Sequence, residues 1–236
     1  MTKTLILIPS RMAATRLPGK PLLKINNLSI ISHVFKRAEE ANIGEVVVAT
    51  DDQEILKDVL KNGGRAILTN KNHKTGTDRI YEAYKKLNVN NIDYILNLQG
   101  DEPDINKDEI INLNNCMINH NAELGTLAAK IKDSKMFNDR NVVKVITDQK
   151  LEESNFPIAL NFTRDNLSTD YQNIYHHIGI YSYKVSVLEK FISLDQTNNE
   201  KINKLEQLRA LDNKLKINVA LAKSSPIGVD TEEDYL

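Results

Sequence analysis

The stretch TLILIPSRMAATRLPGKPL, residues 4–22, joins an apolar run to a loop rich in positive charge. The run Thr4–Pro9 is apolar and β-branched, which predicts a strand of a buried sheet. The loop after it contains Arg11, Arg16 and Lys20, together with two prolines and a glycine. Forked guanidinium donors, a lysine ammonium and backbone amides directly after a strand predict a polyphosphate site. The positive charge by itself would also fit a basic loop that is exposed to solvent and binds no ligand.

The sequence of this loop does not match two common nucleotide-binding patterns. The spacing Gly-x-x-x-x-Gly-Lys-Ser/Thr of a Walker loop is absent, and so is Gly-x-Gly-x-x-Gly. The second absence argues against a dinucleotide-dependent oxidoreductase.

The first half of the chain alternates short β-branched runs with amphipathic stretches. The pattern predicts strands at 4–9, 45–50, 65–68 and 94–98, and helices at 29–41, 53–61, 77–87 and 107–119. Such alternation is typical of an α/β fold with a mostly parallel sheet flanked by helices. Ligands of these folds bind beyond the carboxyl ends of the strands, so the loops after strands are the candidate site.

The order of elements changes after residue 121. Strands are expected at 125–131, 142–147, 174–183 and 216–222, helices at 185–193 and 203–213, and irregular chain over 152–173. We expect a single domain over 1–236, with a smaller lobe or subunit contact at about 122–184.

Composition excludes several classes of protein. Lysine and arginine number 31 against 32 acidic residues, so the net charge of −1 predicts no nucleic-acid or membrane partner. The apolar run Leu5–Pro9 is too short for a signal peptide or a membrane span, and we expect a cytoplasmic protein. The one cysteine, Cys116, is interpreted as a core thiol.

The motif Asn97–Pro103, NLQGDEP, follows the fourth predicted strand and contains Asp101. Magnesium prefers oxygen ligands, often one or two carboxylates completed by substrate phosphates. Asp230, after the last predicted strand, is a candidate for the second carboxylate. Its alternative role is to cap a helix that begins with two glutamates.

The motif His73–Arg79, HKTGTDR, follows the third predicted strand and precedes a helix. Thr77 is expected to cap this helix, and Asp78 is favourable in its first turn. Arg79 is then a candidate for contact with a base or a phosphate.

Adjacent histidines and a later polar cluster complete the candidate residues. His176 and His177 lie on a predicted strand and point to opposite faces, so they are a poor metal pair. His177 is a candidate for hydrogen bonding to a polyol or carboxylate, whereas His176 is expected to face solvent. Spacing alone interprets the polar residues of 204–209 as a solvated helix face, comprising Glu206, Gln207 and Arg209.

Taken in order, these motifs resemble those of the 3-deoxy-manno-octulosonate (Kdo) cytidylyltransferases. The resemblance covers nearly the whole chain. Its blocks are Arg11–Leu22, His73–Arg79, Asn97–Pro103, Asn141–Val145, His177–Tyr181, Leu205–Arg209 and Gly228–Asp234. The chain departs from the family pattern after Arg164, where Asp165-Asn166-Leu167 stands in place of a following Ile-Pro.

The resemblance implies a Rossmann-like nucleotidyltransferase fold with a small β-containing dimerisation lobe, a homodimer and Mg²⁺. It implies CTP and an acidic eight-carbon sugar as substrates, in lipopolysaccharide biosynthesis. The implied nucleotide-binding residues are Arg11, Thr15, Arg16, Lys20, Arg79 and Gln99. The implied sugar-binding residues are Gln99, Arg164, His177, Tyr181, Glu206 and Gln207, the metal ligands are Asp101 and Asp230, and the catalytic set is Arg11, Lys20, Asp101 and Asp230.

Two other functions stay open at this point. One is CMP transfer to a different acidic sugar, such as 8-amino-Kdo or a sialic-acid-like compound. The other is a non-catalytic nucleotide-binding regulator, which has less need of both Asp101 and Asp230.

Overall fold

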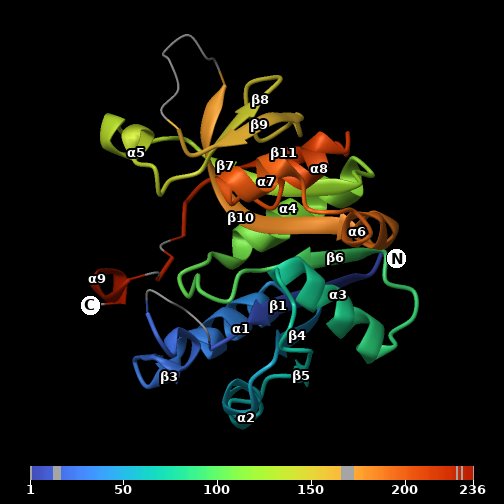
Figure 1. Cartoon of the computed structure of the whole chain (residues 1–236), viewed down its shortest axis with the longest axis vertical. Coiled ribbons are helices and arrows are strands. Elements are labelled where there is room, and N and C mark those ends of the chain that lie inside the picture. The colour runs from blue at the N-terminus through green and yellow to red at the C-terminus, as the bar shows by residue number, and fades with distance from the viewer. Residues whose placement is uncertain (1, 13–16, 166–172, 227, 230, 236) are drawn as a thin grey trace. The chain divides into compact units, whose positions relative to one another are not determined.

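The computed structural model describes residues 2–12, 17–165, 173–226, 228–229 and 231–235 (Figure 1). The chain forms two compact units. Unit 1 comprises Met1–Ile111 and Pro226–Leu236, and unit 2 comprises Asn112–Ser225. The lobe expected at about 122–184 falls within the range of unit 2, and the single-domain assignment stays a prediction.

Unit 1 is built on four parallel strands in the order β6–β1–β4–β5. They are β1 (Thr4–Ser10), β4 (Gly44–Thr50), β5 (Ala66–Leu68) and β6 (Tyr94–Asn97). Thr4 of β1 pairs in register with Gly44 of β4 and with Tyr94 of β6. Residues 5–8 of the central strand are fully buried, which explains why this run is apolar at every position. The predicted parallel sheet is confirmed in this unit.

Helices connect these strands and pack against the sheet. They are α1 (Ile30–Glu40), α2 (Gln53–Lys61), α3 (Gly76–Leu87) and the start of α4 (Lys107–Asn119). Shorter elements are η1 (Lys20–Leu22), β2 (Lys24–Ile25), β3 (Leu28–Ser29) and α9 (Glu232–Tyr235). Ser29 and Asp52 accept hydrogen bonds from the first turns of α1 and α2, so local capping sets where both helices begin.

Unit 2 combines one parallel strand pair with antiparallel pairs. Its strands are β7 (Leu124–Ala129), β8 (Lys144–Thr147), β9 (Ala159–Thr163), β10 (Ile174–Lys184) and β11 (Asn218–Ala222). β11 is parallel to β7, whereas β10 is antiparallel to both β7 and β8, and β9 is antiparallel to β8. The helices are α5 (Ser134–Asn138), α6 (Val185–Ile192), α7 (Asn198–Asn203) and α8 (Leu208–Asp212).

Three local predictions were wrong. The range 152–173 contains the strand β9, whose exposed residues obscure its alternation. The helix expected at 203–213 is shorter, because α7 ends at Asn203, Lys204 adopts a left-handed backbone conformation with φ 52°, and α8 begins only at Leu208. The cap of α3 is Thr75 and not Thr77. Thr75 and Asp78 form a capping box, and Thr77 is buried within the helix.

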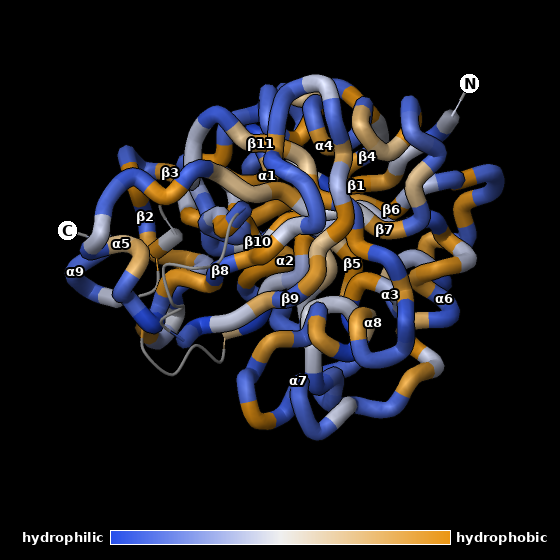
Figure 2. The backbone as a smooth tube through the Cα atoms, turned by 90° about the horizontal axis from the view of Figure 1, so that it is seen from above, coloured by the Kyte–Doolittle hydropathy of each residue, from blue (hydrophilic) through white to orange (hydrophobic). Residues whose placement is uncertain are grey.

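The hydropathy of the chain follows these elements. Figure 2 shows the strands mostly in orange and many connecting loops in blue. Within the described part of the chain, no helix is long and apolar enough to cross a membrane.

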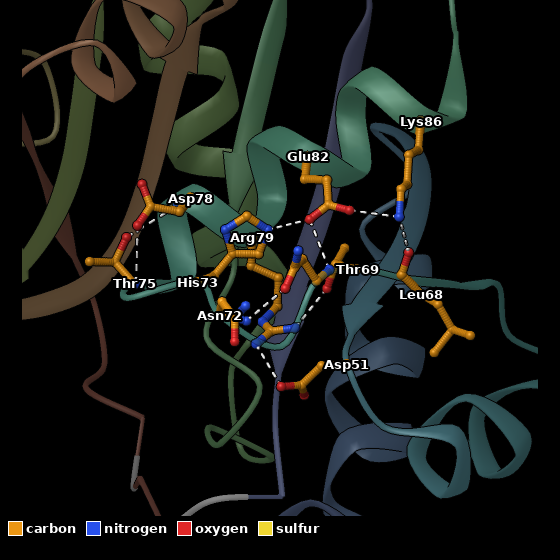
Figure 3. Close-up of polar contacts among 11 residues, drawn as sticks. Asp51, Leu68, Thr69, Asn72, His73, Thr75, Asp78, Arg79, Glu82 and Lys86 are labelled. Carbon is orange, nitrogen blue, oxygen red and sulfur yellow. Dashed lines mark hydrogen bonds and ion pairs between the residues drawn. The ribbon is translucent and has the colours of Figure 1, made fainter.

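A charged cluster fastens the segment after β5 to helix α3 (Figure 3). Glu82 on α3 accepts hydrogen bonds from the backbone of Asn70 at 2.9 Å and from Lys86 at 2.6 Å, and it also contacts the ring of His73. Burial opposes ionisation of Glu82, but the bonds from Lys86, Asn70 and His73 outweigh it and lower its pKa to about 2.

We expect Glu82→Gln to destabilise the protein by about 2 kcal/mol near pH 7, allowing for partial solvent screening. The folded-state pKa of Glu82 is depressed, so its contribution is present above about pH 4.5 and is lost as pH falls toward 2. Denaturant unfolding of both proteins at several pH values measures this difference. Glu40→Gln, in an exposed pair with Arg37, is the control and should cost less than about 0.5 kcal/mol. A Glu82 effect that does not shrink toward acid pH would contradict the assignment.

Candidate functional site

The loop after β1 follows the carboxyl end of the central strand of unit 1, and Arg11 and Lys20 are its described cations. Arg11 directly follows the strand and is exposed. Thr15 and Arg16 lie outside the described residues. Gly19 has φ 72°, a conformation that glycine adopts without steric cost, and it immediately precedes the short helix η1. Lys20 is the first residue of η1, so the backbone turn at Gly19 sets the position of the lysine.

Lys20 contacts the acid of the second motif. Its Nζ lies 2.8 Å from Asp101 Oδ2, although the two residues are 81 positions apart in the chain. The lysine side chain is 12% exposed and the aspartate side chain 38% exposed. The structure therefore brings together two of the predicted catalytic residues.

The loop that carries Asp101 lies close to the backbone of β1. A Cβ atom at Gly100 would be 2.9 Å from the carbonyl oxygen of Pro9, so this position requires glycine. Gln99, one residue earlier, is half-buried. The loop thus combines a tight backbone approach with an accessible carboxylate.

Asp101 fits the donor chemistry that magnesium requires. Its carboxylate is partly exposed, and Val229 donates a backbone hydrogen bond of 3.0 Å to its carbonyl oxygen. Asp230, the second predicted ligand, lies outside the described residues. The described residues hold no cluster of three or more His, Cys, Asp or Glu side chains suited to a metal. This donor set fits an ion whose remaining ligands are phosphate oxygens and water.

Arg79 lies on α3 with its guanidinium engaged by other side chains (Figure 3). It donates to Thr69 Oγ1 at 2.6 Å and to Asp51 Oδ2 at 3.1 Å, and the residue is 3% exposed. These contacts join α3 to the residues that directly follow β4 and β5. Its predicted contact with the nucleotide stays a prediction.

In unit 2, His177 and Tyr181 of β10 form a buried polar cluster with Thr126 of β7. His177 Nε2 lies 2.9 Å from the Tyr181 hydroxyl and 3.1 Å from Thr126 Oγ1. Thr126 donates its single proton to a backbone carbonyl, that of Ile180 at 2.7 Å in the shorter of two contacts. Its oxygen can then accept from His177 Nε2–H, which favours that tautomer.

Burial decides the protonation of this cluster. Desolvation lowers the pKa of His177 to about 3, so the imidazole is neutral near pH 7. Burial, with the neighbouring Tyr183 and Glu206, raises the pKa of Tyr181 well above its ordinary value. The two groups can therefore offer neutral hydrogen bonds to a polyol.

His176 points away from this cluster. Its Nδ1 lies 2.8 Å from Ser225 Oγ, and burial lowers its pKa. The expectation that His176 faces solvent was wrong. The prediction that the two histidines diverge is confirmed, because the ring of His177 contacts Thr126 whereas the ring of His176 contacts Ser225.

Arg164 and Lys144 tie two loops of unit 2 together. Arg164 donates to the carbonyl oxygen of Asn141 at 3.0 Å. Lys144 is fully buried, and its Nζ donates to the carbonyl oxygens of Asp139 at 2.7 Å and Arg164 at 3.4 Å. Desolvation lowers the pKa of Lys144. The lysine thus anchors the backbone of a predicted sugar-binding residue.

The polar residues of 204–209 are not a solvated face, contrary to the interpretation from spacing. Gln207 is 9% exposed and Arg209 is 3% exposed. Arg209 forms a forked pair with Glu200, at 2.9 and 2.6 Å, and lies 3.8 Å from Glu206. Residues 204–207 lie outside a helix, since α7 ends before Lys204 and α8 begins at Leu208, so the helical spacing used for the prediction does not apply there.

Sequence reasoning did not assign roles to Thr126, Lys144 or Glu200. Lys144 carries a signal, since a lysine between valines of a predicted buried strand needs polar partners. Thr126, in an apolar strand, and Glu200, in a polar run, have no comparable signal. Cys116 is half-buried and burial raises the pKa of its thiol, which agrees with the absence of a nucleophilic role.

The two units offer different chemistry. Unit 1 pairs an ammonium with an accessible carboxylate at the edge of a parallel sheet, an arrangement suited to polyphosphate and a divalent cation. Unit 2 gathers neutral imidazole, phenol and amide groups beside an ionisable carboxylate, an arrangement suited to a hydroxyl-rich ligand.

Comparison with known proteins agrees with this chemistry. The family model for cytidylyltransferases matches residues 5–217. The chain is 44% identical to 3-deoxy-manno-octulosonate cytidylyltransferase of Rhodopseudomonas palustris strain BisB18, covering 99% of this chain and 95% of that protein. It is also 44% identical to the enzyme of that name from Thermodesulfovibrio yellowstonii, over 98% of this chain and 94% of the relative.

Solved structures give the same assignment. A CMP:2-keto-3-deoxy-manno-octonic acid synthetase complexed with CTP has a TM-score of 0.89 and 34% identity, covering 98% of this chain and 95% of the other. This likeness confirms the predicted nucleotidyltransferase fold. A UDP-glucose pyrophosphorylase, at TM-score 0.73 and 16% identity over 100% of this chain and 96% of the other, shares the fold alone. By these similarities the chain belongs to the cytidylyltransferase family, among the 3-deoxy-manno-octulosonate cytidylyltransferases.

Proposed function

We propose that this protein transfers CMP from CTP to Kdo, giving CMP-Kdo and pyrophosphate. The observation that carries the proposal is the contact of Lys20 with Asp101, 2.8 Å long, at the carboxyl end of the unit 1 sheet. A nucleotidyltransferase needs a cation for the departing phosphates and a carboxylate for a divalent ion, and this contact supplies both. The near full-length similarity to Kdo cytidylyltransferases supports the choice of nucleotide and sugar.

The reaction is an in-line displacement at phosphorus. The anomeric hydroxyl of Kdo forms a bond to the α-phosphorus of CTP while the bond to the bridging oxygen of pyrophosphate breaks. The hydroxyl proton passes to solvent, because none of the described side chains is assigned as a general base. Arg11, Arg16 and Lys20 neutralise the departing pyrophosphate, so catalysis rests on alignment and charge stabilisation.

Asp101 and Asp230 would hold Mg²⁺ together with phosphate oxygens. The ion would supply positive charge at the triphosphate and make a bound hydroxyl easier to deprotonate. Lys20 has a second role in this proposal: its ammonium, 2.8 Å from Asp101 Oδ2, holds that carboxylate in one orientation.

The remaining roles follow the family resemblance. Gln99, Arg164, His177, Tyr181, Glu206 and Gln207 are proposed to bind the sugar, and Thr15 and Arg79 to contact the nucleotide. The neutral state of His177 supports this, since a neutral imidazole has one ring nitrogen that donates and one that accepts hydrogen bonds, as hydroxyl groups do. We place the reaction in lipopolysaccharide biosynthesis in the cytoplasm.

We also propose a homodimer. Leu160 on β9 is 60% exposed, and among the described strands β9 pairs with β8. An exposed apolar residue on an edge strand is typical of a surface that another chain covers.

Pyrophosphate release from CTP tests the function. With Mg²⁺ present, we expect release with Kdo, and at least a tenfold lower kcat/KM with 8-amino-Kdo or N-acetylneuraminate. Chelator should abolish release. Asp101→Asn should lower kcat by more than about 100-fold with its circular dichroism unchanged, because a metal ligand is lost. Release with another sugar only would show that this other sugar, and not Kdo, is the substrate. Near-normal turnover by Asp101→Asn would show that Asp101 is not a metal ligand.

The neutral state of His177 leads to a separate prediction about the KM for Kdo. His177→Phe should raise the KM for Kdo about tenfold, since it removes a buried hydrogen bond but keeps an aromatic ring against Phe162, 5.0 Å away. The depressed pKa, about 3, means that the wild-type imidazole is uncharged throughout pH 5.5–8. The ratio of variant to wild-type KM should therefore be constant over that range. A ratio that changes tenfold across it would show that His177 titrates.

A further inference from the structure

A buried ion pair in unit 2 lies beside two of the proposed sugar-binding residues. Arg209 donates from Nε to Glu200 Oε2 at 2.9 Å and from a terminal nitrogen to Glu200 Oε1 at 2.6 Å. The side chains are 3% and 4% exposed. The guanidinium carbon lies 4.6 Å from the ring centre of Phe191, and Gln196 donates to Glu200 at 3.1 Å. The pair is thus held in one geometry from several sides.

The ion pair closes a short segment whose middle carries Glu206 and Gln207. Glu200 lies on α7 and Arg209 on α8, and a turn with Lys204 in the left-handed conformation joins the two helices. Within it, the backbone of Arg209 donates to the carbonyl oxygen of Glu206 at 3.1 Å. Because both ends of the segment are joined through side chains, the turn has little freedom to change shape.

Arg209 also acts on Glu206 through charge. Its terminal nitrogen is 3.8 Å from Glu206 Oε1, so the cation lies between two carboxylates. The attraction between the two opposite charges restrains the Glu206 carboxylate on the side of Arg209. Burial, Tyr183 and Glu206 together raise the pKa of Tyr181, so the Glu206 carboxylate acts on the His177–Tyr181 cluster. The charged network therefore continues from α7 to the proposed sugar residues of β10.

Stability alone is a weak reason for this arrangement. Replacing a buried ion pair with apolar side chains is often neutral or stabilising, because desolvation offsets the attraction between the charges. The ion pair fixes the position of a third charge, that of Glu206. A pair of apolar side chains would not do so.

We propose that Glu200 and Arg209 are positioning residues that fix the turn bearing Glu206 and Gln207 and orient the Glu206 carboxylate for the hydroxyls of the acidic sugar. The inference rests on the proposed function. The pair acts on sugar binding and leaves nucleotide binding unchanged, since its described partners are Phe191 of α6, Gln196 before α7, and Glu206.

The test is steady-state kinetics of the double variant Glu200→Met/Arg209→Met on the full-length protein. With circular dichroism and thermal midpoint near wild type, we expect the KM for Kdo to rise about tenfold and the KM for CTP to change less than twofold. Asp212→Asn is the matched control. It removes the charge from a carboxylate that accepts hydrogen bonds from Thr197 and Asn199, and the described contacts of that carboxylate include neither sugar residue, so both KM values should stay within twofold.

A folded double variant with an unchanged KM for Kdo would overturn the inference, and so would an equal rise in both KM values. Arg209→Lys decides the case if the double variant does not fold. It keeps the charge but loses the fork, and the KM for Kdo should rise at least threefold; an unchanged value overturns the inference. Wild-type turnover with Kdo tests the proposed function separately. Should only another acidic sugar react, the same comparisons apply with that sugar.

Discussion

The candidate site of this enzyme depends on the contact between Lys20 and Asp101. Neither side chain has a strong assignment alone, since a lysine in a basic loop and an aspartate after a strand are both common. At 2.8 Å, they join the loop after β1 to the loop after β6. The parallel sheet makes this contact possible, because adjacent parallel strands deliver their following loops to the same edge. Gly100 completes it, since a larger residue would collide with the backbone at Pro9.

The second unit, which we propose binds the sugar, contains buried polar and charged side chains. A hydroxyl-rich acidic sugar requires several fixed polar groups, and burying such groups is costly unless each has a partner. Here the partners come from secondary structure and from other side chains. Thr126 and Tyr181 contact His177, backbone carbonyls accept from Lys144, and Glu200 binds Arg209. Desolvation then keeps His177 neutral, so the unit combines neutral groups with a few paired charges.

Much of the fold could be predicted because the core obeys simple periodicities. The fully buried β1 is apolar at each central position, and the limits of α2 and α4 match the expected ranges. Errors arose where one residue's backbone or a tertiary partner decided the outcome. A left-handed Lys204 ends α7, so the helix predicted from residue 203 begins only at Leu208. The buried state of Arg209 depends on Glu200, which local spacing does not reveal as its partner.

In the candidate site, too, residues that act through sequence motifs could be predicted, whereas residues that act through tertiary contacts could not. Motif order and residue chemistry indicated Lys20 and Asp101, and the structure brings them together. Thr126 and Lys144 were missed because their roles depend on contacts with distant strands and loops.

A double-mutant cycle on kcat/KM for CTP, with Lys20→Met, Asp101→Asn and the double variant, tests the central claim most directly. If the two residues act as one unit on the triphosphate and its ion, the double variant should be about as impaired as the worse single variant. Losses that multiply, so that the double variant shows the product of the two single effects, would contradict that claim.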